Sequence, residues 1–281
     1  MSLFTFSHEL FYIFYLLDHE SIPSNEMYNL VKHACDQNYG IISQCFRAEK
    51  LERSPNGYFE NLLLKVNGKI GGQNTALESS ELLKLPFNPA ETMLVGMDVN
   101  HPGSTERVLS SVAAAVGSYD KSFSQYNASI TVQKKERDEM VISIDTMMTE
   151  LLNQYHKVNN VYPKNVIIFR DGVSDGQFNK VLTIEIPRIE SAFRQEKIYN
   201  EKHMINLTVI IVQKRHHARF ALSQEQGGAG GRNNNKNFSL MYNVPSGTVV
   251  DQAIVDPRYR SFYINSHFSP LVSLLCVDFV Y

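Results

Sequence analysis

Two apolar segments that each run into an aspartate, with an amphipathic helix between them, most constrain the fold of this chain. Residues 93–97 lead into Asp98, and residues 166–169 lead toward Asp171. Between them, apolar side chains recur three and four positions apart over residues 141–155, which predicts a helix with one buried face. Buried strands that alternate with helices predict an α/β fold, here with mixed strand directions.

Further segments extend this pattern. Short apolar stretches predict strands at residues 108–116, 128–133 and 207–212. A second helix is expected to begin near Gln177, and Pro187 inside it predicts a kink or a split because proline lacks the N–H that a helix uses. Residues 226–237 are rich in Gly and Asn, which is typical of a low-complexity insertion rather than of a phosphate-binding loop.

The N-terminal part predicts a separate, smaller unit. Residues 10–17 form an apolar run that is expected to be a buried strand and is shorter than the roughly 20 residues that span a bilayer. Further elements are expected at residues 26–35, 41–46 and 59–66. Two prolines within residues 85–89 disfavour both a helix and a central strand. We therefore expect one domain over residues 1–90 and a second over residues 91–281.

The overall charge excludes a globally basic nucleic-acid-binding protein. The 281 residues contain 27 Lys and Arg against 29 Asp and Glu, a formal net charge of −2. Binding to a polyanion therefore requires a local basic patch. Residues 213–219 (Gln-Lys-Arg-His-His-Ala-Arg) offer such a patch directly after an expected strand, and a solvated charged turn is the alternative interpretation.

The cysteine pattern points away from a zinc site or a disulfide framework. Cys35, Cys45 and Cys276 are odd in number and widely spaced, and they form no Cys-x-x-Cys pair. Cys45 lies in an apolar stretch, which predicts a buried thiol. The pattern indicates a reducing, intracellular compartment, so we expect the protein in the cytoplasm, with the nucleus as the alternative.

The two aspartates that follow the core strands are candidates for metal ligands. Ligands of α/β sheets bind outside the carboxyl ends of the strands, where Asp98 and Asp171 are expected. Two carboxylates brought together repel one another unless cations neutralise them. Oxygen ligands favour Mg²⁺ or Mn²⁺, and a pair of such ions about 3.5–4 Å apart can support phosphodiester cleavage. The alternative is that both aspartates only form caps or turns at the strand ends.

A scattered set of cations, an amide and a phenol is the second candidate site. Its members are Tyr28, Lys32, Gln44, Lys65 and Lys69. Tyr28 and Lys32 are four positions apart, and so are Lys65 and Lys69. This spacing places the two members of each pair on the same face of a helix. Such side chains can enclose a terminal phosphate, but ordinary surface lysines would show the same spacing.

These features occur together in one family. The chain resembles the Mid and Piwi domains of Argonaute proteins from about residue 28 to residue 267. The resemblance is carried by residues 96–102 (Gly-Met-Asp-Val-Asn-His-Pro), 170–178 (Arg-Asp-Gly-Val-Ser-Asp-Gly-Gln-Phe), 212–219, 243–248 (Asn-Val-Pro-Ser-Gly-Thr) and 266–267. It implies an RNase H-like Piwi domain with a mixed sheet, preceded by a partial Rossmann-like Mid domain. It also implies a small guide RNA that pairs with a complementary target RNA in gene silencing, and no membrane.

The resemblance assigns phosphate contacts to both parts of the chain. The residues that match the pocket for the 5′ phosphate of the guide are Tyr28, Lys32, Gln44, Lys65 and Lys69. The residues that match contacts to the guide backbone are Lys214, Arg219 and His267.

The resemblance also implies a catalytic site. Family members that cleave their targets use an Asp-Glu-Asp-His tetrad around divalent metals, Mg²⁺ or Mn²⁺. Asp98 and Asp171 match the two aspartates, which would hold the metal, and Glu139 matches the glutamate. Glu139 is favoured over Glu136 because it lies eleven positions before Glu150, as in the family. A helix first turn, where a carboxylate complements the helix dipole, is the alternative explanation for Glu139.

The sequence departs from the family pattern after His267. Residues 268–276 do not match the loop and strands that lead to the catalytic histidine, and His267 itself matches a guide contact. We therefore expect a chain truncated at both ends, impaired cleavage, and apolar sheet surface left exposed. The alternatives are a guide-binding module without catalysis and a non-functional fragment.

Overall fold

The protein is described here by a computed structural model. It describes residues 12–17, 24–47, 57–103, 110–133, 139–195, 204–214, 216–218, 220, 244–255, 260–266 and 275–279. The chain divides into two compact units, of which the first ends at Ala76 and the second begins at Leu77. This division lies before the proline-containing segment 85–89, and that segment belongs to the second unit.

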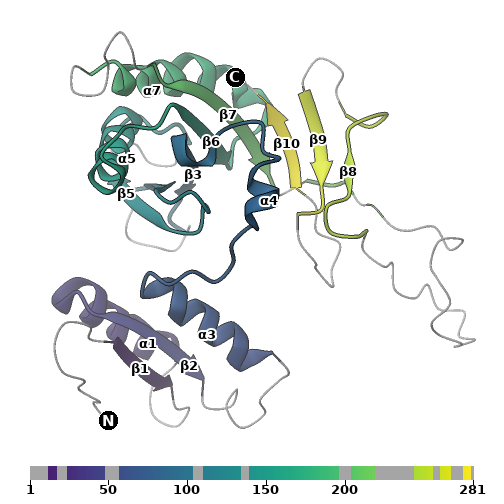
Figure 1. Ribbon diagram of the computed structural model, residues 1–281. Helices are drawn as coiled ribbons and strands as arrows, with labels where there is room; N and C mark the ends of the chain where they lie inside the picture. The colour runs from purple at the N-terminus through teal and green to yellow at the C-terminus, as the bar shows by residue number, and fades with distance from the viewer. Residues whose placement is uncertain are drawn as a thin grey trace, which may run out of the picture. The chain divides into compact units, whose positions relative to one another are not determined.

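The N-terminal unit is a small β-α-β arrangement (Figure 1). Its strands, β1 (Tyr12–Leu17) and β2 (Ile42–Arg47), pair in parallel. Parallel strands need a crossover connection, and it contains α1 (Ser24–Lys32) and the π-helix η1 (His33–Tyr39). Helix α3 (Tyr58–Lys69) follows β2. The strand and helix segments expected from the sequence are thus present.

The second unit is built on a mixed eight-stranded sheet with the order β5-β4-β3-β6-β7-β10-β9-β8. The strands are β3 (Thr92–Asn100), β4 (Val112–Ser118), β5 (Tyr126–Val132), β6 (Asn165–Asp171), β7 (Asn206–Gln213), β8 (Val249–Val250), β9 (Arg260–Ile264) and β10 (Leu275–Phe279). The three central strands β3, β6 and β7 are parallel, and the others pair antiparallel. The expected α/β class with mixed strand directions is confirmed. The short helices α4 (Ser79–Leu82) and η2 (Pro89–Glu91) precede β3.

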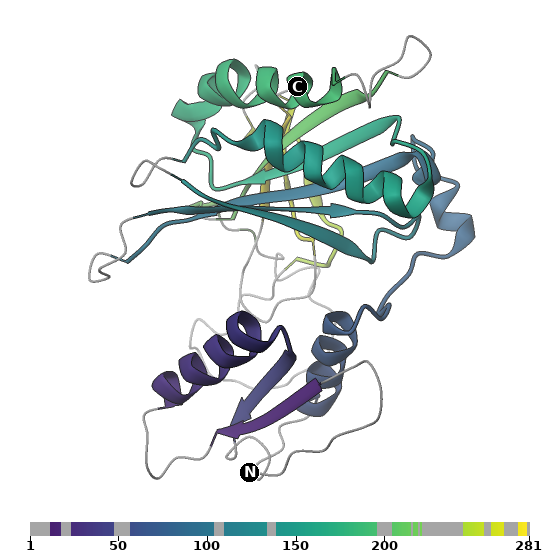
Figure 2. The same cartoon turned by 90° about the vertical axis from the view of Figure 1, so that its left-hand side faces the viewer.

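Two helical segments lie on one face of this sheet (Figure 2). The first is α5 (Ile144–Asn159), whose expected apolar face is buried. The second comprises η3 (Asp175–Gln177), α6 (Phe178–Lys180), the π-helix η4 (Val181–Glu185) and α7 (Ile186–Phe193). The predicted break near Pro187 therefore takes the form of a π-helical turn that ends just before it. Among the described residues, no helix is long and apolar enough to cross a membrane.

Removal of a core side chain from α5 should destabilise the second unit strongly. Leu152 is fully buried in the core between α5 and the sheet. Leu152→Ala should lower the free energy of unfolding by about 2–5 kcal/mol, because it loses apolar burial and leaves a cavity. The matched control is Val158→Ala on the same helix, where the side chain is 53% exposed and a change of less than about 0.5 kcal/mol is expected. Urea denaturation of both variants measures the difference, and equal losses would contradict this placement of the core.

Successive side chains along each strand point to opposite faces of the sheet. In β3, Met93, Val95 and Met97 are buried, whereas Asp98 is exposed. A hollow of about 650 Å³ lies on strand residues that include Gly96, Val116, Phe169, Val212 and Ile264. Val116 and Phe169 are 40% and 39% exposed, so apolar sheet surface is accessible in the described part of the chain, as expected.

Candidate active site and anion-binding pocket

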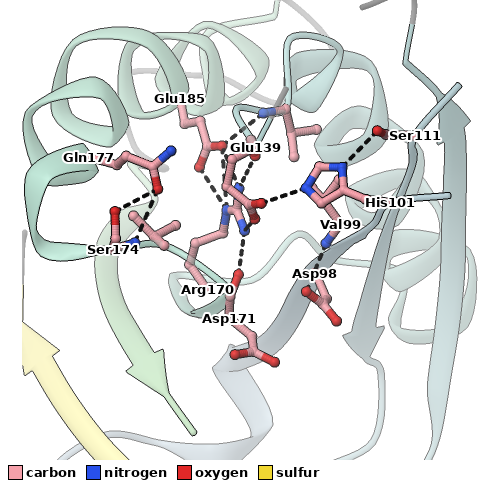
Figure 3. Close-up of polar contacts among 12 residues, drawn as sticks. Asp98, Val99, His101, Ser111, Glu139, Arg170, Asp171, Ser174, Gln177 and Glu185 are labelled. Carbon is pink, nitrogen blue, oxygen red and sulfur yellow. Dashed lines mark hydrogen bonds and ion pairs between the residues drawn. The ribbon is translucent and has the colours of Figure 1, made fainter. Parts of the chain in front are cut away.

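The sheet register places Asp98 and Asp171 beside each other. The neighbouring strands β3 and β6 are parallel, and Met97 pairs with Arg170, so the next residues along the two strands are the two aspartates. Paired residues of parallel strands present their side chains to the same face of the sheet. Both aspartates line one cavity of about 700 Å³, and Figure 3 shows them at the same end of the two strands. β3 continues two residues beyond Asp98 to Asn100, because it stays paired with β4 there.

Glu139 reaches the same cavity from the segment before α5. It precedes Ile144, the first residue of α5, so the first-turn explanation of this carboxylate is wrong. The space between the carboxylates depends on Gly172, which has a φ of +90°. A Cβ atom at this position would lie 2.8 Å from Oε1 of Glu139 and 3.4 Å from Oδ1 of Asp98. Glycine is therefore needed both for the backbone conformation and for the close approach of the carboxylates.

The Glu139 carboxylate is held by two neighbours. Its Oε2 lies 2.8 Å from Nε2 of His101, whose Nδ1 lies 2.7 Å from the Ser111 hydroxyl. Its Oε1 accepts a hydrogen bond of 3.3 Å from Nη1 of Arg170. These contacts leave 15% of the Glu139 side chain exposed, so the carboxylate has a fixed orientation at the edge of the cavity (Figure 3).

The sequence analysis did not predict that Arg170 and Glu185 support the Glu139 carboxylate. Arg170 and Glu185 are both completely buried, and Arg170 donates hydrogen bonds to the Glu185 carboxylate. A signal was present in each case: Arg170 follows Val166 and Ile168 at the inward positions of a strand, and Glu185 lies on the apolar side of a helix. Charged residues at buried positions mark paired groups, because an unpaired buried charge is strongly disfavoured.

The expected basic segment begins at the edge of the carboxylate cavity. Lys214, which directly follows β7, forms an ion pair with Oδ2 of Asp171. Gln213 donates hydrogen bonds of 2.9 Å to the carbonyl of Val173 and 2.8 Å to Oδ1 of Asp175. A cation thus already neutralises one of the paired aspartates. The other predicted backbone contacts, Arg219 and His267, lie outside the described residues, as do the Gly- and Asn-rich residues 226–237.

The donor set suits a hard divalent cation. Asp98 and Asp171 supply carboxylate oxygens on one face of the sheet, and Mg²⁺ is commonly bound through one or two carboxylates while it keeps several waters. Within the described ranges, no cluster of three or more His, Cys, Asp or Glu side chains is arranged to hold a metal ion. Asp98 and Asp171 are candidate ligands only because they line the same cavity, with Glu139 beside them.

The N-terminal unit contains a separate cationic pocket of about 460 Å³. Lys32 Nζ, from α1, donates hydrogen bonds of 3.0 Å to the Ser43 carbonyl and 2.9 Å to the Ser43 hydroxyl. Lys69 Nζ, from the end of α3, donates to the same carbonyl at 2.8 Å and to Oε1 of Gln44 at 2.9 Å. Two ammonium groups therefore converge on one backbone oxygen. The carboxylate of Asp36 lies 3.8 Å from Lys32, at the edge of an ordinary ion pair.

Burial and charge both act on Lys69. Burial lowers the pKa of its ammonium group, and the neighbouring Lys32 charge lowers the pKa further. An anion placed between the two lysines would relieve this repulsion, so the pocket is electrostatically suited to an anion.

Three members of the predicted set, Tyr28, Gln44 and Lys65, are not among the residues that line this pocket, although Gln44 accepts a hydrogen bond from the pocket residue Lys69. Tyr28 and Lys65 each lie one turn before a pocket lysine on their helices, and Tyr28 is 44% exposed. The prediction of a buried Cys45 thiol needs correction, because Cys45 is only partly buried whereas Cys35 is buried. In β2, Ser43 takes the buried position, and Cys45 lies close enough to Lys32 and Lys69 for their charges to act on its thiol.

A mixed α/β sheet with paired aspartates on adjoining central strands, in a chain that also contains a small β-α-β unit, matches the MID-PIWI class of fold. The Piwi domain model matches residues 12–271. The chain is 36% identical to Protein argonaute 18 of Oryza sativa subsp. japonica, in a match that covers 85% of this chain and 21% of the rice protein. The chain therefore belongs to the Piwi domain family.

Solved structures agree with this membership. The chain matches the Argonaute of Kluyveromyces polysporus with a guide RNA at a TM-score of 0.80 and 28% identity, which covers 96% of this chain and 30% of that one. It also matches the MID-PIWI domains of an Argonaute from N. crassa at a TM-score of 0.57 and 29% identity, over 71% of this chain and 55% of that one. This chain spans about a fifth of the length of the curated relatives that it matches.

Proposed function

We propose that this chain binds the 5′-phosphorylated end of a small guide RNA and pairs that guide with complementary RNA in gene silencing. The observation that carries the proposal is the convergence of Lys32 and Lys69 on the Ser43 carbonyl in the N-terminal pocket. A terminal phosphate can accept a charge-assisted hydrogen bond from each ammonium group. The family membership supports the guide as the source of that phosphate, and one structural relative is an Argonaute with a guide RNA.

The direct test compares two RNAs that differ only at the 5′ end. Fluorescence anisotropy should show tighter binding of a 5′-phosphorylated RNA than of the same RNA with a 5′ hydroxyl. Binding of the phosphorylated RNA should also weaken with salt, because each neutralised phosphate releases counterions. Equal affinities would refute the proposed phosphate pocket.

Binding of a 5′ phosphate should weaken as the pH rises through the alkaline range. The pKa of Lys69 is lowered by burial and by Lys32, so Lys69 loses its proton at a lower pH than an ordinary lysine. The bound phosphate favours the protonated form, hence affinity should fall as that proton is lost. Titration calorimetry with a nucleoside 5′-monophosphate between pH 7.5 and 10 measures the trend. Lys69→Arg, whose guanidinium keeps its charge, should flatten it, and an equally steep loss in this variant would contradict the assignment.

We further propose that the second unit carries an RNase H-like carboxylate site. Asp98 and Asp171 would hold Mg²⁺ or Mn²⁺, with Glu139 completing the site. A divalent cation at this position would supply activation of water and stabilisation of the leaving oxygen in phosphodiester cleavage. The chain contributes the fixed orientation of Glu139 through Arg170 and His101. Cleavage is proposed to be weak, because residues 268–276 depart from the pattern that leads to the histidine of the family tetrad.

Incubation with a guide RNA, a labelled complementary RNA and Mg²⁺ tests this second proposal. Slow or absent cleavage together with guide binding is the expected result, and it corresponds to a guide-binding module. Robust Mg²⁺-dependent cleavage that Asp171→Ala abolishes would show that the site is complete without a matching segment after His267. A chain without a cooperative melting transition would instead favour the non-functional alternative.

A further inference from the structure

Glu185 occupies a position where an aliphatic side chain would be expected. It is the last residue of η4, and its neighbours on the inward side of this helical segment are Val181, Ile186 and Ile189, all of them buried. Glu185 itself is 0% exposed. A carboxylate at such a position is strongly disfavoured unless charged and polar partners surround it. π-helical turns are rare and are frequent at functional sites, so this turn also calls for an explanation.

The partners of Glu185 come from two other segments. Arg170 of β6 donates from Nε to Oε2 and from Nη2 to Oε1, each at 3.1 Å. The backbone N–H of Val141, in the segment before α5, donates to Oε1 at 2.8 Å. Glu185 therefore connects the helical segment, the end of β6 and the segment that bears Glu139.

Arg170 also contacts the carboxylate site. Its Nη2 also donates to the backbone carbonyl of Glu139, and its Nη1 donates to the Asp171 carbonyl and to Oε1 of Glu139. One guanidinium group, 0% exposed, is thus shared between Glu185 on one side and the candidate site on the other (Figure 3).

We propose that Glu185 is a positioning residue for this site. It fixes the Arg170 guanidinium and the Val141 amide, and through both it holds Glu139 beside Asp98 and Asp171. It also balances the positive charge of Arg170, which leaves the charge of Glu139 available to a cation in the cavity. Without Glu185, the guanidinium would have Glu139 as its nearest carboxylate, and that carboxylate would be neutralised. The inference rests on the proposed metal-binding function of the site.

The test replaces Glu185 with glutamine, which has nearly the same shape but no charge. Titration calorimetry of the whole chain with Mn²⁺ should show affinity at least about 10-fold weaker for Glu185→Gln than for the wild type, because loss of an outer-shell partner commonly costs 10–100-fold in metal affinity. Hydrogen exchange should be faster at the amides of residues 139–141, because Val141 loses a charged acceptor. The matched control is Glu190→Gln on α7, whose carboxylate pairs with Arg194 on the surface, and it should change neither measurement.

The outcomes separate this inference from the proposed function. If the wild type binds Mn²⁺ and Glu185→Gln binds it equally well with unchanged exchange at residues 139–141, the positioning role is overturned, even if the melting temperature falls. If the wild type does not bind Mn²⁺, the metal-binding proposal fails, and unchanged exchange in the variant would overturn the positioning of Glu139 as well. If Glu185→Gln fails to fold, Glu185→Asp replaces it, because aspartate keeps the charge on a shorter side chain. Its Mn²⁺ affinity should be lower than that of the wild type and higher than that of Glu139→Gln, which removes the charge of Glu139 itself. Wild-type affinity in Glu185→Asp would contradict the inference.

Discussion

Replacing both Lys32 and Lys69 with alanine should remove the preference for 5′-phosphorylated RNA. Each ammonium group can form a charge-assisted hydrogen bond, and such bonds contribute about 1.5–3 kcal/mol each. Two such bonds together contribute about 3–6 kcal/mol, so the double variant should bind the phosphorylated RNA on the order of 10²–10⁴-fold more weakly. It should bind the 5′-hydroxyl RNA nearly as the wild type does. Fluorescence anisotropy with the two RNAs measures both effects.

A second double variant controls for the loss of two positive charges. Lys157→Ala combined with Lys180→Ala removes two exposed lysines from α5 and α6 of the second unit. It should weaken the binding of both RNAs by the same small factor and leave the ratio of the two affinities unchanged. If the two double variants behave alike, Lys32 and Lys69 act only through general charge, and the pocket has no specific role.

Asp171→Ala should abolish measurable binding of Mn²⁺ at the carboxylate site. The substitution removes one of two candidate ligands, and changes outside the ligand shell alone commonly cost 10–100-fold in metal affinity. A loss of at least about 100-fold is therefore expected in a calorimetric titration, together with loss of any cleavage that the wild type shows.

Asp175→Ala is the matched control for this variant. Asp175 lines the same cavity, but it lies beyond the end of β6 and accepts a hydrogen bond from Gln213. It should leave Mn²⁺ affinity within about threefold of the wild type, because Asp175 is not one of the three carboxylates assigned to the site and acts only through screened charge. Equal losses in the two variants would show that the cavity attracts cations diffusely and has no defined ligand pair.

Much of the fold follows from local sequence pattern. The core strands β3, β6 and β7 are continuous apolar segments, and the buried face of α5 follows helical periodicity, so both could be predicted. The proximity of Asp98 and Asp171 was also predictable, because the carboxyl ends of parallel strands meet at one edge of a sheet. These predictions depend on local apolar segments, on helical periodicity and on the place of the aspartates at the strand ends, all of which a single sequence displays.

The contacts of Arg170 and Glu185 that hold Glu139 could not be predicted from local sequence pattern. The pattern places Arg170 at an inward position of a strand and Glu185 on the apolar side of a helix, but it does not show that these two groups pair with each other. Their pairing joins segments that are distant along the chain, and no period encodes it. The cationic pocket shows the same limit: helical spacing paired Tyr28 with Lys32, but the contacts on Ser43 come from Lys32 and Lys69 on different helices.

A crystal structure of this protein with a 5′-phosphorylated RNA tests the central claim of guide capture most directly. The 5′ phosphate should lie within hydrogen-bond distance of both Lys32 Nζ and Lys69 Nζ, in the pocket beside Ser43. A phosphate bound elsewhere, with the two lysines still on the Ser43 carbonyl and the pocket filled by solvent, would contradict the account.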